Sequence, residues 1–341
     1  MKIVCVCDAG VTPKLMACMK EIPDCQVELV TDESIMDPKA ITKAMRISET
    51  QGPEAYCTTP EVLEAVRDAD AIVVHVAPVN QAMLDAAPNV KYVGVLRTGY
   101  DNINVELCRE RGIQVYNSEG RNSEAVADLT VGLMICEMRN IARAHAALMS
   151  GKWVKLFPNV LYSHDMRRCT VGIIGVGKIG SMVAQRLHGF GCTVLGCDLF
   201  LPDEAVRARG CEPVSMEELL KRSDFITLHL RLDESTHHMI SSAQLDMMKK
   251  TAVLVNCGRS GLVDTDALID ALQNHRIGGA AIDVFDEEPL PEDHPYFHLD
   301  NVTLTPHIAG TTIDAFANSA EIMRDVFTAL FGRGEQRNRI V

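Results

Sequence analysis

The sequence lacks the features of a membrane protein and of a protein that binds nucleic acid. No apolar run reaches the roughly 18 residues that a helix needs to span a bilayer. Basic residues are in the minority, because 33 lysines and arginines stand against 46 aspartates and glutamates, and the net charge of −13 opposes binding to nucleic acid or to an anionic membrane. We therefore expect a soluble protein whose anionic ligands, if any, bind in a local basic pocket.

Paired cysteine spacings are also missing. The chain has twelve cysteines but no CxxC pair, which disfavours a metal site and a disulfide framework. Buried reduced thiols are the simpler expectation, and they indicate a cytoplasmic protein. The first eight residues are too short and too soon charged for a signal peptide, and they read as a strand in which we expect Cys5 and Cys7 to face opposite sides of a sheet.

Two α/β patterns follow each other along the chain. Its 341 residues and 47% hydrophobic content suffice for two domains with their own cores. A long helix is expected over residues 123–149, and a helix over residues 312–330 is expected to pack back on the first domain. The pattern predicts an α/β fold with two doubly wound parallel sheets. Short apolar runs predict strands near residues 3–7, 27–30, 71–76, 92–96 and 113–115, and then near residues 170, 193, 225, 252, 279 and 302.

A glycine-rich turn joins a predicted strand to a predicted helix in the middle of the chain. Gly175, Gly177 and Gly180 separate the apolar run 170–174 from the helical spacing of 178–189. Such glycines let the backbone approach a pyrophosphate at the positive end of a helix. Asp198 follows the next strand, where a carboxylate accepts hydrogen bonds from ribose hydroxyls and repels a 2′-phosphate. The pattern predicts a site for NAD rather than NADP, and the alternative is an accidental glycine turn.

Three polar residues downstream of the turn form a candidate catalytic set. His307 follows Pro306 at the end of a predicted strand, and a histidine there can take or return the proton of an alcohol. Glu288 would hydrogen-bond this imidazole and fix its orientation. Arg259 would bind a carboxylate with its planar guanidinium, which favours an α-hydroxy or α-keto acid as the substrate. The plain alternatives are a structural histidine, a solvated glutamate and a surface ion pair.

Six ordered motifs carry a resemblance to a known family. They are Gly99-Tyr100-Asp101-Asn102-Ile103, Glu124-Ala125-Val126-Ala127-Asp128, the glycine turn with Asp198, Asn256-Cys257-Gly258-Arg259, Ala281-Ile282-Asp283-Val284-Phe285 with Glu288-Pro289, and Thr305-Pro306-His307. Through them the whole chain resembles the D-isomer-specific 2-hydroxyacid dehydrogenases, including the phosphoglycerate dehydrogenases. The resemblance implies a flavodoxin-like substrate-binding domain of residues 1–121 and 311–341, and an inserted Rossmann NAD-binding domain of residues 122–310. It also implies hydride transfer between NAD(H) and a D-2-hydroxy or 2-keto acid.

The resemblance further implies a set of binding residues. The backbone amides of Thr98 and Gly99, together with Arg259, would bind the substrate carboxylate. Besides the glycines, Asp198, Arg259 and His307, the implied cofactor contacts are Lys178 and Ile179 at the pyrophosphate, Leu230, Arg231 and Thr236 on the adenosine side, Cys257 and Asp283 at the nicotinamide end, and Gly310.

Two positions depart from the usual pattern of this family. Arg231 stands where relatives usually have proline, which adds a positive charge to that loop. Arg97 stands where most relatives have a small residue, at the end of an apolar strand. Its side chain either points to solvent or binds a distal anionic or polyhydroxyl group. We hypothesise the second, which predicts a longer hydroxy acid with a phosphate or a second carboxylate.

Two other functions and one assembly state stay open at this point. A regulatory protein of the corepressor type resembles this family, keeps the triad and senses NADH without significant turnover, although no basic stretch supports it here. A formate- or phosphite-type dehydrogenase is disfavoured, because formate enzymes resemble this fold but carry glutamine in place of Glu288. A homodimer is the family expectation, and the apolar surface of residues 123–149 and of the Trp153 segment supports it.

Overall fold

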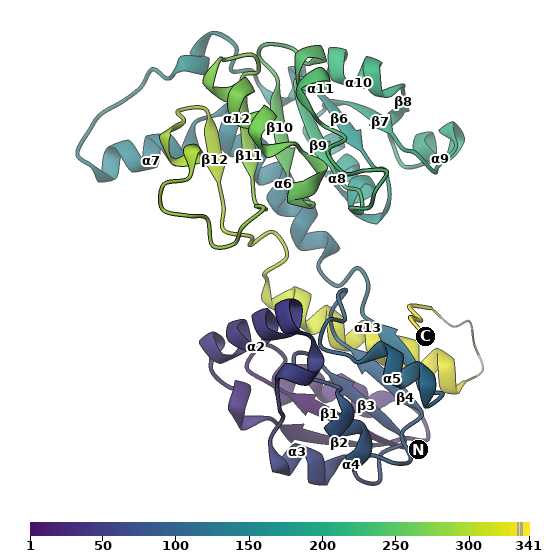
Figure 1. Cartoon of the computed structure of the whole chain (residues 1–341). Coiled ribbons are helices and arrows are strands. Elements are labelled where there is room, and N and C mark those ends of the chain that lie inside the picture. Colours follow the sequence, from purple (N-terminus) through teal and green to yellow (C-terminus); the bar gives the residue numbers. More distant parts are fainter. Residues whose placement is uncertain (333, 335–336) are drawn as a thin grey trace. The chain divides into compact units, whose positions relative to one another are not determined.

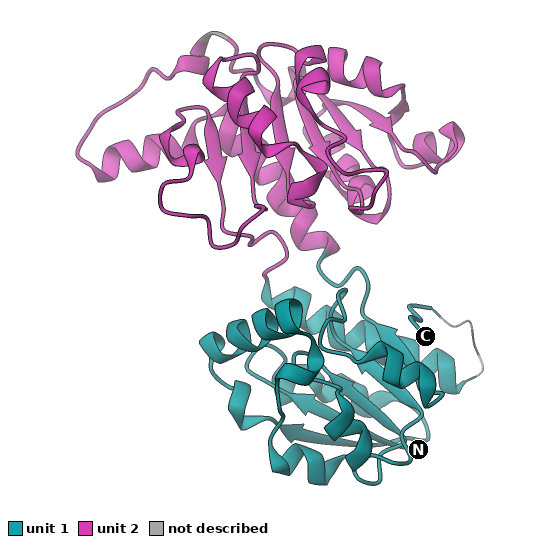
Figure 2. Ribbon diagram, viewed as in Figure 1, with its two compact units in different colours: residues 1–122, 312–341 teal, residues 123–311 magenta. Residues whose placement is uncertain are grey.

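Two parallel sheets, each in its own unit, organise the structure, a computed structural model that describes residues 1–332, 334 and 337–341. Unit 1 comprises residues 1–122 and 312–341, and unit 2 comprises residues 123–311 (Figure 2). All the strand pairings within the two sheets are parallel. The predicted fold class is therefore confirmed.

Unit 1 is built on a five-stranded sheet with the order β2-β1-β3-β4-β5 (Figure 1). This is the order of flavodoxin-like folds. Its strands are β1 (Lys2–Cys7), β2 (Gln26–Thr31), β3 (Ala71–Val74), β4 (Tyr92–Val95) and β5 (Gln114–Asn117). Its helices are α1 (Pro13–Met16), α2 (Pro38–Gln51), α3 (Pro60–Ala65), α4 (Gln81–Ala86), α5 (Val105–Glu110) and α13 (Ile313–Phe331).

The side chains of β1 show how the two faces of this sheet are packed. Val4 and Val6 belong to one hydrophobic cluster, whereas Cys5 and Cys7 belong to a second cluster that includes Phe327 of α13. Side chains of a strand alternate with a period of two, so residues two apart share a face. The expectation that Cys5 and Cys7 face opposite sides is therefore wrong.

Unit 2 is built on a seven-stranded sheet with the order β12-β11-β10-β9-β6-β7-β8 (Figure 1). The order in which strands are added to the sheet reverses beside β6, as in Rossmann folds. Only the two-residue strand β8 was not predicted. The strands are β6 (Thr170–Ile174), β7 (Thr193–Cys197), β8 (Glu212–Pro213), β9 (Phe225–Leu228), β10 (Val253–Asn256), β11 (Gly279–Ile282) and β12 (Val302–Leu304). The helices are α6 (Ser123–Met138), α7 (Ile141–Met149), α8 (Lys178–Gly189), α9 (Asp203–Ala208), α10 (Met216–Arg222), α11 (Ser242–Met247) and α12 (Thr265–Gln273).

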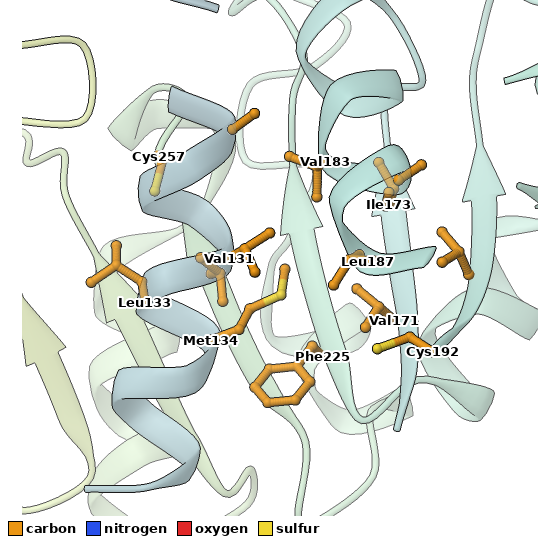
Figure 3. Packing of buried hydrophobic residues seen from close by; sticks show 14 of the residues in the cluster. Val131, Leu133, Met134, Val171, Ile173, Val183, Leu187, Cys192, Phe225 and Cys257 are labelled. Atoms are coloured by element: carbon orange, nitrogen blue, oxygen red, sulfur yellow. The ribbon is translucent and has the colours of Figure 1, made fainter. Parts of the chain in front are cut away.

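One face of this sheet is covered by α6 and α8. Val131 and Met134 of α6 belong to the same buried cluster as Leu187 of α8 and Phe225 of β9 (Figure 3). This apolar contact positions the amino end of α8, which follows the glycine turn. The packing of the core thus places the turn at the carboxyl edge of the sheet.

Residues 123–149 form two helices, α6 and α7, rather than the single helix expected. Asn140 separates them with a φ of 54°, in the left-handed region. Asparagine adopts this conformation more readily than most residues, and its amide donates a hydrogen bond to the side chain of Asn159 at 2.6 Å. Apolar spacing alone does not reveal such a break, because it depends on one backbone angle and a distant partner.

Two general expectations can be compared with the structure. Within the part of the chain that the structure describes, no helix is long and apolar enough to cross a membrane. The twelve cysteines are free thiols, and seven of them are buried. Burial raises the pKa of Cys7 to about 12 and that of Cys108 to about 11, so both thiols are protonated and unreactive at neutral pH.

A buried ion pair holds α6 and α7 to the sheet of unit 2. Glu137 is 3% exposed, and its carboxylate accepts hydrogen bonds from Arg143 at 2.7 Å and from the hydroxyl of Thr303 at 2.5 Å. The charge of Glu137 is compensated mainly by Arg143. A buried carboxylate that loses its partner is strongly destabilising.

We predict that Arg143→Met lowers the free energy of unfolding by about 3 kcal/mol, because it leaves the carboxylate of Glu137 buried and unpaired. Urea denaturation followed by circular dichroism measures this effect. The double variant Glu137→Gln/Arg143→Met removes the charge as well and should recover part of the loss. Equal unfolding midpoints for wild type and Arg143→Met would show that the pair contributes nothing.

Candidate active site

The glycine turn between β6 and α8 has three positions with different steric limits. A Cβ on Gly175, whose φ is 88°, would lie 2.6 Å from the backbone oxygen of His229. A Cβ on Gly180 would lie 2.1 Å from the oxygen of Gly175, whereas a Cβ on Gly177 would have no described atom within 4 Å. The folded backbone therefore has no room for a side chain at Gly175 or Gly180. At Gly177 there is open space beside the backbone.

The amino end of α8 offers hydrogen-bond donors to that space. Gly177 is the N-cap residue and has no side chain with which to cap the helix. Among the described residues, the backbone amides of Lys178 and Ile179 have no hydrogen-bond partner. Free amides at the positive end of a helix dipole form an anion site. The turn thus fits the pyrophosphate of a dinucleotide.

Asp198 lies beside the turn at the end of β7. Its Oδ2 accepts the N–H of Val176 at 2.7 Å, and its Oδ1 accepts those of Phe200 and Leu201 at 2.9 and 3.0 Å. Backbone hydrogen bonds therefore fix the carboxylate next to the turn. Each carboxylate oxygen has two acceptor positions, so Oδ2 can accept one more hydrogen bond, for example from a hydroxyl of ribose.

The loop after β9 carries three of the expected cofactor residues. Leu230 lies beside the turn, with its Cδ2 2.8 Å from a Cβ built on Gly175. Thr236 is 1% exposed, and its hydroxyl donates to the carbonyl of Arg231 at 2.7 Å and accepts the N–H of Asp233 at 2.9 Å. Thr236 therefore stabilises this loop through hydrogen bonds to the backbone of the loop itself.

His229 was not among the expected site residues, although it precedes this loop directly. Its Nε2 lies 3.1 Å from the hydroxyl of Thr227. Burial lowers the pKa of His229 to about 4, so its imidazole is neutral at pH 7. The backbone oxygen of His229 borders Gly175 of the turn, while its neutral ring contacts Thr227. No sequence signal other than the neighbouring motif pointed to this residue.

Arg259 is exposed in the loop after β10. Asn256, which sequence reasoning treated only as part of a motif, accepts the N–H of Gly258 at 3.0 Å and donates to the carbonyl of Arg259 at 2.9 Å. Nη1 of Arg259 donates to the carbonyl of Gly258 at 2.8 Å, and no carboxylate of the described residues pairs with the guanidinium. The alternative of a surface ion pair is therefore not what the structure shows.

Glu288 and His307 form a hydrogen-bonded pair. Nδ1 of His307 lies 2.8 Å from Oε2 of Glu288, and Oε1 of Glu288 accepts the N–H of Phe285 at 3.0 Å. An ionised carboxylate only accepts hydrogen bonds, so Nδ1 carries the proton and Nε2 remains available. The side chain of His307 is 50% exposed. The pair therefore presents an oriented imidazole nitrogen to solvent or to a ligand.

Asp283 supports the loop that carries His307. It is fully buried, and its Oδ1 accepts the hydroxyl of Thr305 at 2.6 Å and the N–H of Ile308 at 2.9 Å. Its Oδ2 accepts the N–H of Ala309, one residue before Gly310, at 2.8 Å. The backbone of His307 has a φ of 53°, and these bonds hold the loop in that conformation.

Cys257 was also expected at the nicotinamide end. Its thiol is 6% exposed and belongs to the buried cluster around α6 (Figure 3). Burial raises its pKa to about 12. Direct contacts of Cys257 and Asp283 with a cofactor remain predictions, and the structure shows only how both residues support the edge of the sheet.

The three expected catalytic residues follow three adjacent strands. Arg259 comes after β10, Glu288 after β11 and His307 after β12, and β10, β11 and β12 are neighbours in the sheet. The strands are parallel, so their carboxyl ends lie at one edge. The glycine turn follows β6 at the same edge.

The expected substrate loop belongs to unit 1. Arg97 is 7% exposed and pairs with Glu49 at 3.0 Å, so it does not point to solvent. The carbonyl of Thr98 accepts the amide of Asn117 at 2.8 Å. The backbone amides of Thr98 and Gly99 have no partner among the described residues, which leaves both donors available.

Comparison with known proteins identifies the family. Residues 131–309 match the family model "D-isomer specific 2-hydroxyacid dehydrogenase, NAD binding domain". The chain is 39% identical to the glyoxylate reductase of Korarchaeum cryptofilum, over 83% of this chain and 85% of that protein. It is 41% identical to the D-3-phosphoglycerate dehydrogenase of Methanocaldococcus jannaschii over 83% of its own length, but it spans only 54% of that longer relative.

A solved structure extends the similarity to both units. The NAD-complexed D-isomer specific 2-hydroxyacid dehydrogenase from Lactobacillus delbrueckii ssp. bulgaricus is 26% identical, and it matches with a TM-score of 0.78 over 100% of both chains. The resemblance found in the six motifs is thus confirmed. The chain belongs to the D-isomer-specific 2-hydroxyacid dehydrogenases and is an NAD-dependent oxidoreductase.

Proposed function

We propose that this enzyme interconverts a D-2-hydroxy acid and its 2-oxo acid, with His307 as the general acid and base. The observation that carries the proposal is the 2.8 Å hydrogen bond between Nδ1 of His307 and Glu288, which leaves Nε2 available. Nε2 takes the hydroxyl proton when the alcohol is oxidised and returns it when the ketone is reduced. Glu288 keeps the ring oriented and stabilises the imidazolium while it exists.

Arg259 binds the carboxylate of the substrate in this proposal. Its guanidinium has donors in a planar fork, and no described carboxylate competes for them. In unit 1, the free amides of Thr98 and Gly99 are donors for a substrate carboxylate. Donors of this kind orient the reacting carbon and favour 2-oxo acids over simple ketones.

The cofactor contacts follow the glycine turn. The amides of Lys178 and Ile179 hold the pyrophosphate, Asp198 accepts a ribose hydroxyl, and Leu230 borders the adenosine side together with the Arg231 loop. NAD supplies the nicotinamide carbon that gives or receives the hydride. Asp283, Cys257 and Gly310 border the nicotinamide end, and Asp283 also keeps the His307 loop in place.

We predict that NADH supports the reduction of 2-oxo acids and that His307→Ala lowers kcat roughly a hundredfold or more, because the proton donor is lost. Glu288→Gln should lower kcat about tenfold, since a neutral amide stabilises the imidazolium less than a carboxylate does. NADH oxidation with glyoxylate, pyruvate, hydroxypyruvate and 2-oxoglutarate measures both effects, and NADPH should serve poorly because of Asp198.

The exposed His298 provides the control, and His298→Ala should behave as wild type. Tight NADH binding without turnover that depends on His307 would contradict the proposal. That result would instead favour a regulatory protein of the corepressor type.

A pair of glycine variants tests the cofactor site. Gly180→Ala should destabilise unit 2 by about 1–3 kcal/mol, because the new methyl would overlap the oxygen of Gly175. Gly177→Ala should keep the melting temperature of the free enzyme but weaken NADH binding roughly tenfold, about 1.4 kcal/mol, since the methyl occupies the space of the pyrophosphate. Calorimetric titration and thermal melting separate the two effects. Unchanged NADH affinity in Gly177→Ala would place the pyrophosphate elsewhere.

We further propose that the enzyme is a homodimer that pairs through α7 and the segment after it. Within unit 2 this segment projects away from the sheet (Figure 1). Its exposed apolar side chains include Met149, Trp153 and Leu156, which are 75, 80 and 76% exposed. Soluble monomers rarely expose so many large apolar groups together, and a two-fold contact buries the same patch on both subunits.

We predict that light scattering gives twice the chain mass of 37.4 kDa for the wild type. Trp153→Asp combined with Leu156→Asp should produce monomers, because it places charges in the apolar patch. Phe200→Asp is a control, since this residue is 79% exposed in a different loop. A monomeric wild type at micromolar concentration would end the dimer proposal.

A further inference from the structure

Three basic side chains lie at the carboxyl edge of the unit 1 sheet. His75 follows β3, Arg97 follows β4, and Arg121 lies a few residues beyond β5. β3, β4 and β5 are neighbours in the parallel sheet. Their loops therefore meet at the edge where α/β sheets place ligands.

Arg97 is buried with half of its guanidinium unpaired. It is 7% exposed, and its Nη2 donates to Glu49 at 3.0 Å. Its Nη1 is also buried but has no hydrogen-bond partner. Glu49 itself is a half-exposed residue at the rim of the site. The ion pair with Glu49 thus satisfies Nη2 of the guanidinium and leaves Nη1 without a hydrogen-bond partner.

Arg121 adds a second guanidinium to this edge. Its Nη1 is buried without a partner, and its Cζ lies 5.4 Å from the ring centre of Phe316. Burial and, next, the charge of Arg97 lower the pKa of Arg121 to about 10. The two guanidiniums are therefore close enough to repel each other, and Glu49 is the one described carboxylate that pairs with either of them.

His75 contacts the same aromatic ring as Arg121, that of Phe316. It is 1% exposed, its Nδ1 lies 3.0 Å from Asp8, and its ring meets the ring of Phe316 edge-on at 5.6 Å. Asp8 also accepts two backbone N–H groups, those of Gly10 and Val11 at 2.8 Å. The carboxylate of Asp8 is thus hydrogen-bonded by its own neighbours. Nε2 of His75 is buried and has no partner.

Folded proteins leave few buried donors unpaired, and such groups call for a physical reason. Here two of them, the Nη1 atoms of Arg97 and Arg121, come from guanidiniums at one sheet edge. A ligand with several acceptor oxygens would pair these nitrogens and reduce the repulsion between Arg97 and Arg121. Planar guanidiniums bind carboxylate and phosphate oxygens in a bidentate manner.

We propose that Arg97 and Arg121 form a subsite for a second anionic group of the substrate, either a carboxylate or a phosphate. The inference rests on the proposed function, because Thr98 and Gly99, whose amides would bind the first carboxylate, directly follow Arg97. Adjacent Cα atoms are about 3.8 Å apart, so the backbone of Arg97 and the two amides belong to one short loop. The substrate is then a dianionic 2-hydroxy or 2-oxo acid.

Steady-state kinetics with NADH test this subsite. The substrates are glyoxylate, which has no second anion, 2-oxoglutarate, which has a second carboxylate, and phosphohydroxypyruvate, which has a phosphate. For each enzyme, kcat/KM for a dianionic substrate is divided by kcat/KM for glyoxylate. For at least one of the two dianionic substrates, we expect this ratio to be roughly ten- to a hundredfold lower in Arg97→Gln and in Arg121→Gln than in the wild type. Arg67→Gln is the control. The side chain of Arg67 is 68% exposed and pairs with Glu64, and Arg67 lies before the amino end of β3. Ratios within about threefold of wild type in both variants would overturn the subsite.

A binding measurement separates this inference from the proposed function. Inorganic phosphate or malonate should raise the melting temperature of the wild type, and the increase should vanish in Arg121→Gln. Without added anion, the melting temperature of Arg121→Gln should equal or exceed that of the wild type, because one of two repelling charges is removed. A lower melting temperature would show that Arg121 has a structural role instead. Turnover of glyoxylate that depends on His307, without any of these anion effects, would overturn the subsite and leave the proposed function intact. Anion binding that depends on Arg121, without turnover of any acid, would overturn the assignment to a substrate.

Discussion

In a parallel sheet the carboxyl ends of all the strands lie at one edge, and this constraint decides where the polar groups of both units gather. In unit 2 the glycine turn, Arg259, Glu288 and His307 follow β6, β10, β11 and β12. Most strands of these parallel sheets are buried on both faces, so most of their residues are apolar. Reactive side chains therefore come from the loops at the edge, and the sheet determines their order.

Buried polar side chains fix the loops at this edge through hydrogen bonds within unit 2. Asp283 fixes the loop of His307, Asn256 fixes that of Arg259, and Thr236 closes the loop after β9. Each of these groups would be costly to leave unpaired, so the loops resist local rearrangement. The imidazole of His307 is thus oriented before a ligand arrives, and little ordering remains to be done on binding.

The sequence was most informative where the signal is local. Apolar runs located nearly all the strands, and the glycine spacing located the turn. The family resemblance and the following Pro289 selected Glu288 as the partner of His307, and the structure shows this pair at 2.8 Å. Features that depend on distant partners were missed. The break at Asn140 needs a left-handed residue and a contact with Asn159, and the inward hydrogen bonds of Asp283 need a loop 25 residues away. Such contacts follow from tertiary structure, which periodicity does not encode.

Electrostatics makes the same distinction between long and short range. The net charge of −13 repels an anionic acid at a distance, but at physiological salt exposed charges act over only about 8 Å. Recognition of an anion must then come from donors within contact distance. The free amides of α8 and the guanidinium of Arg259 are such donors, and in unit 1 the buried nitrogens of Arg97 and Arg121 are too. Because buried charges interact more strongly than exposed ones, a few enclosed guanidiniums outweigh many surface carboxylates, and an acidic enzyme can select acidic substrates.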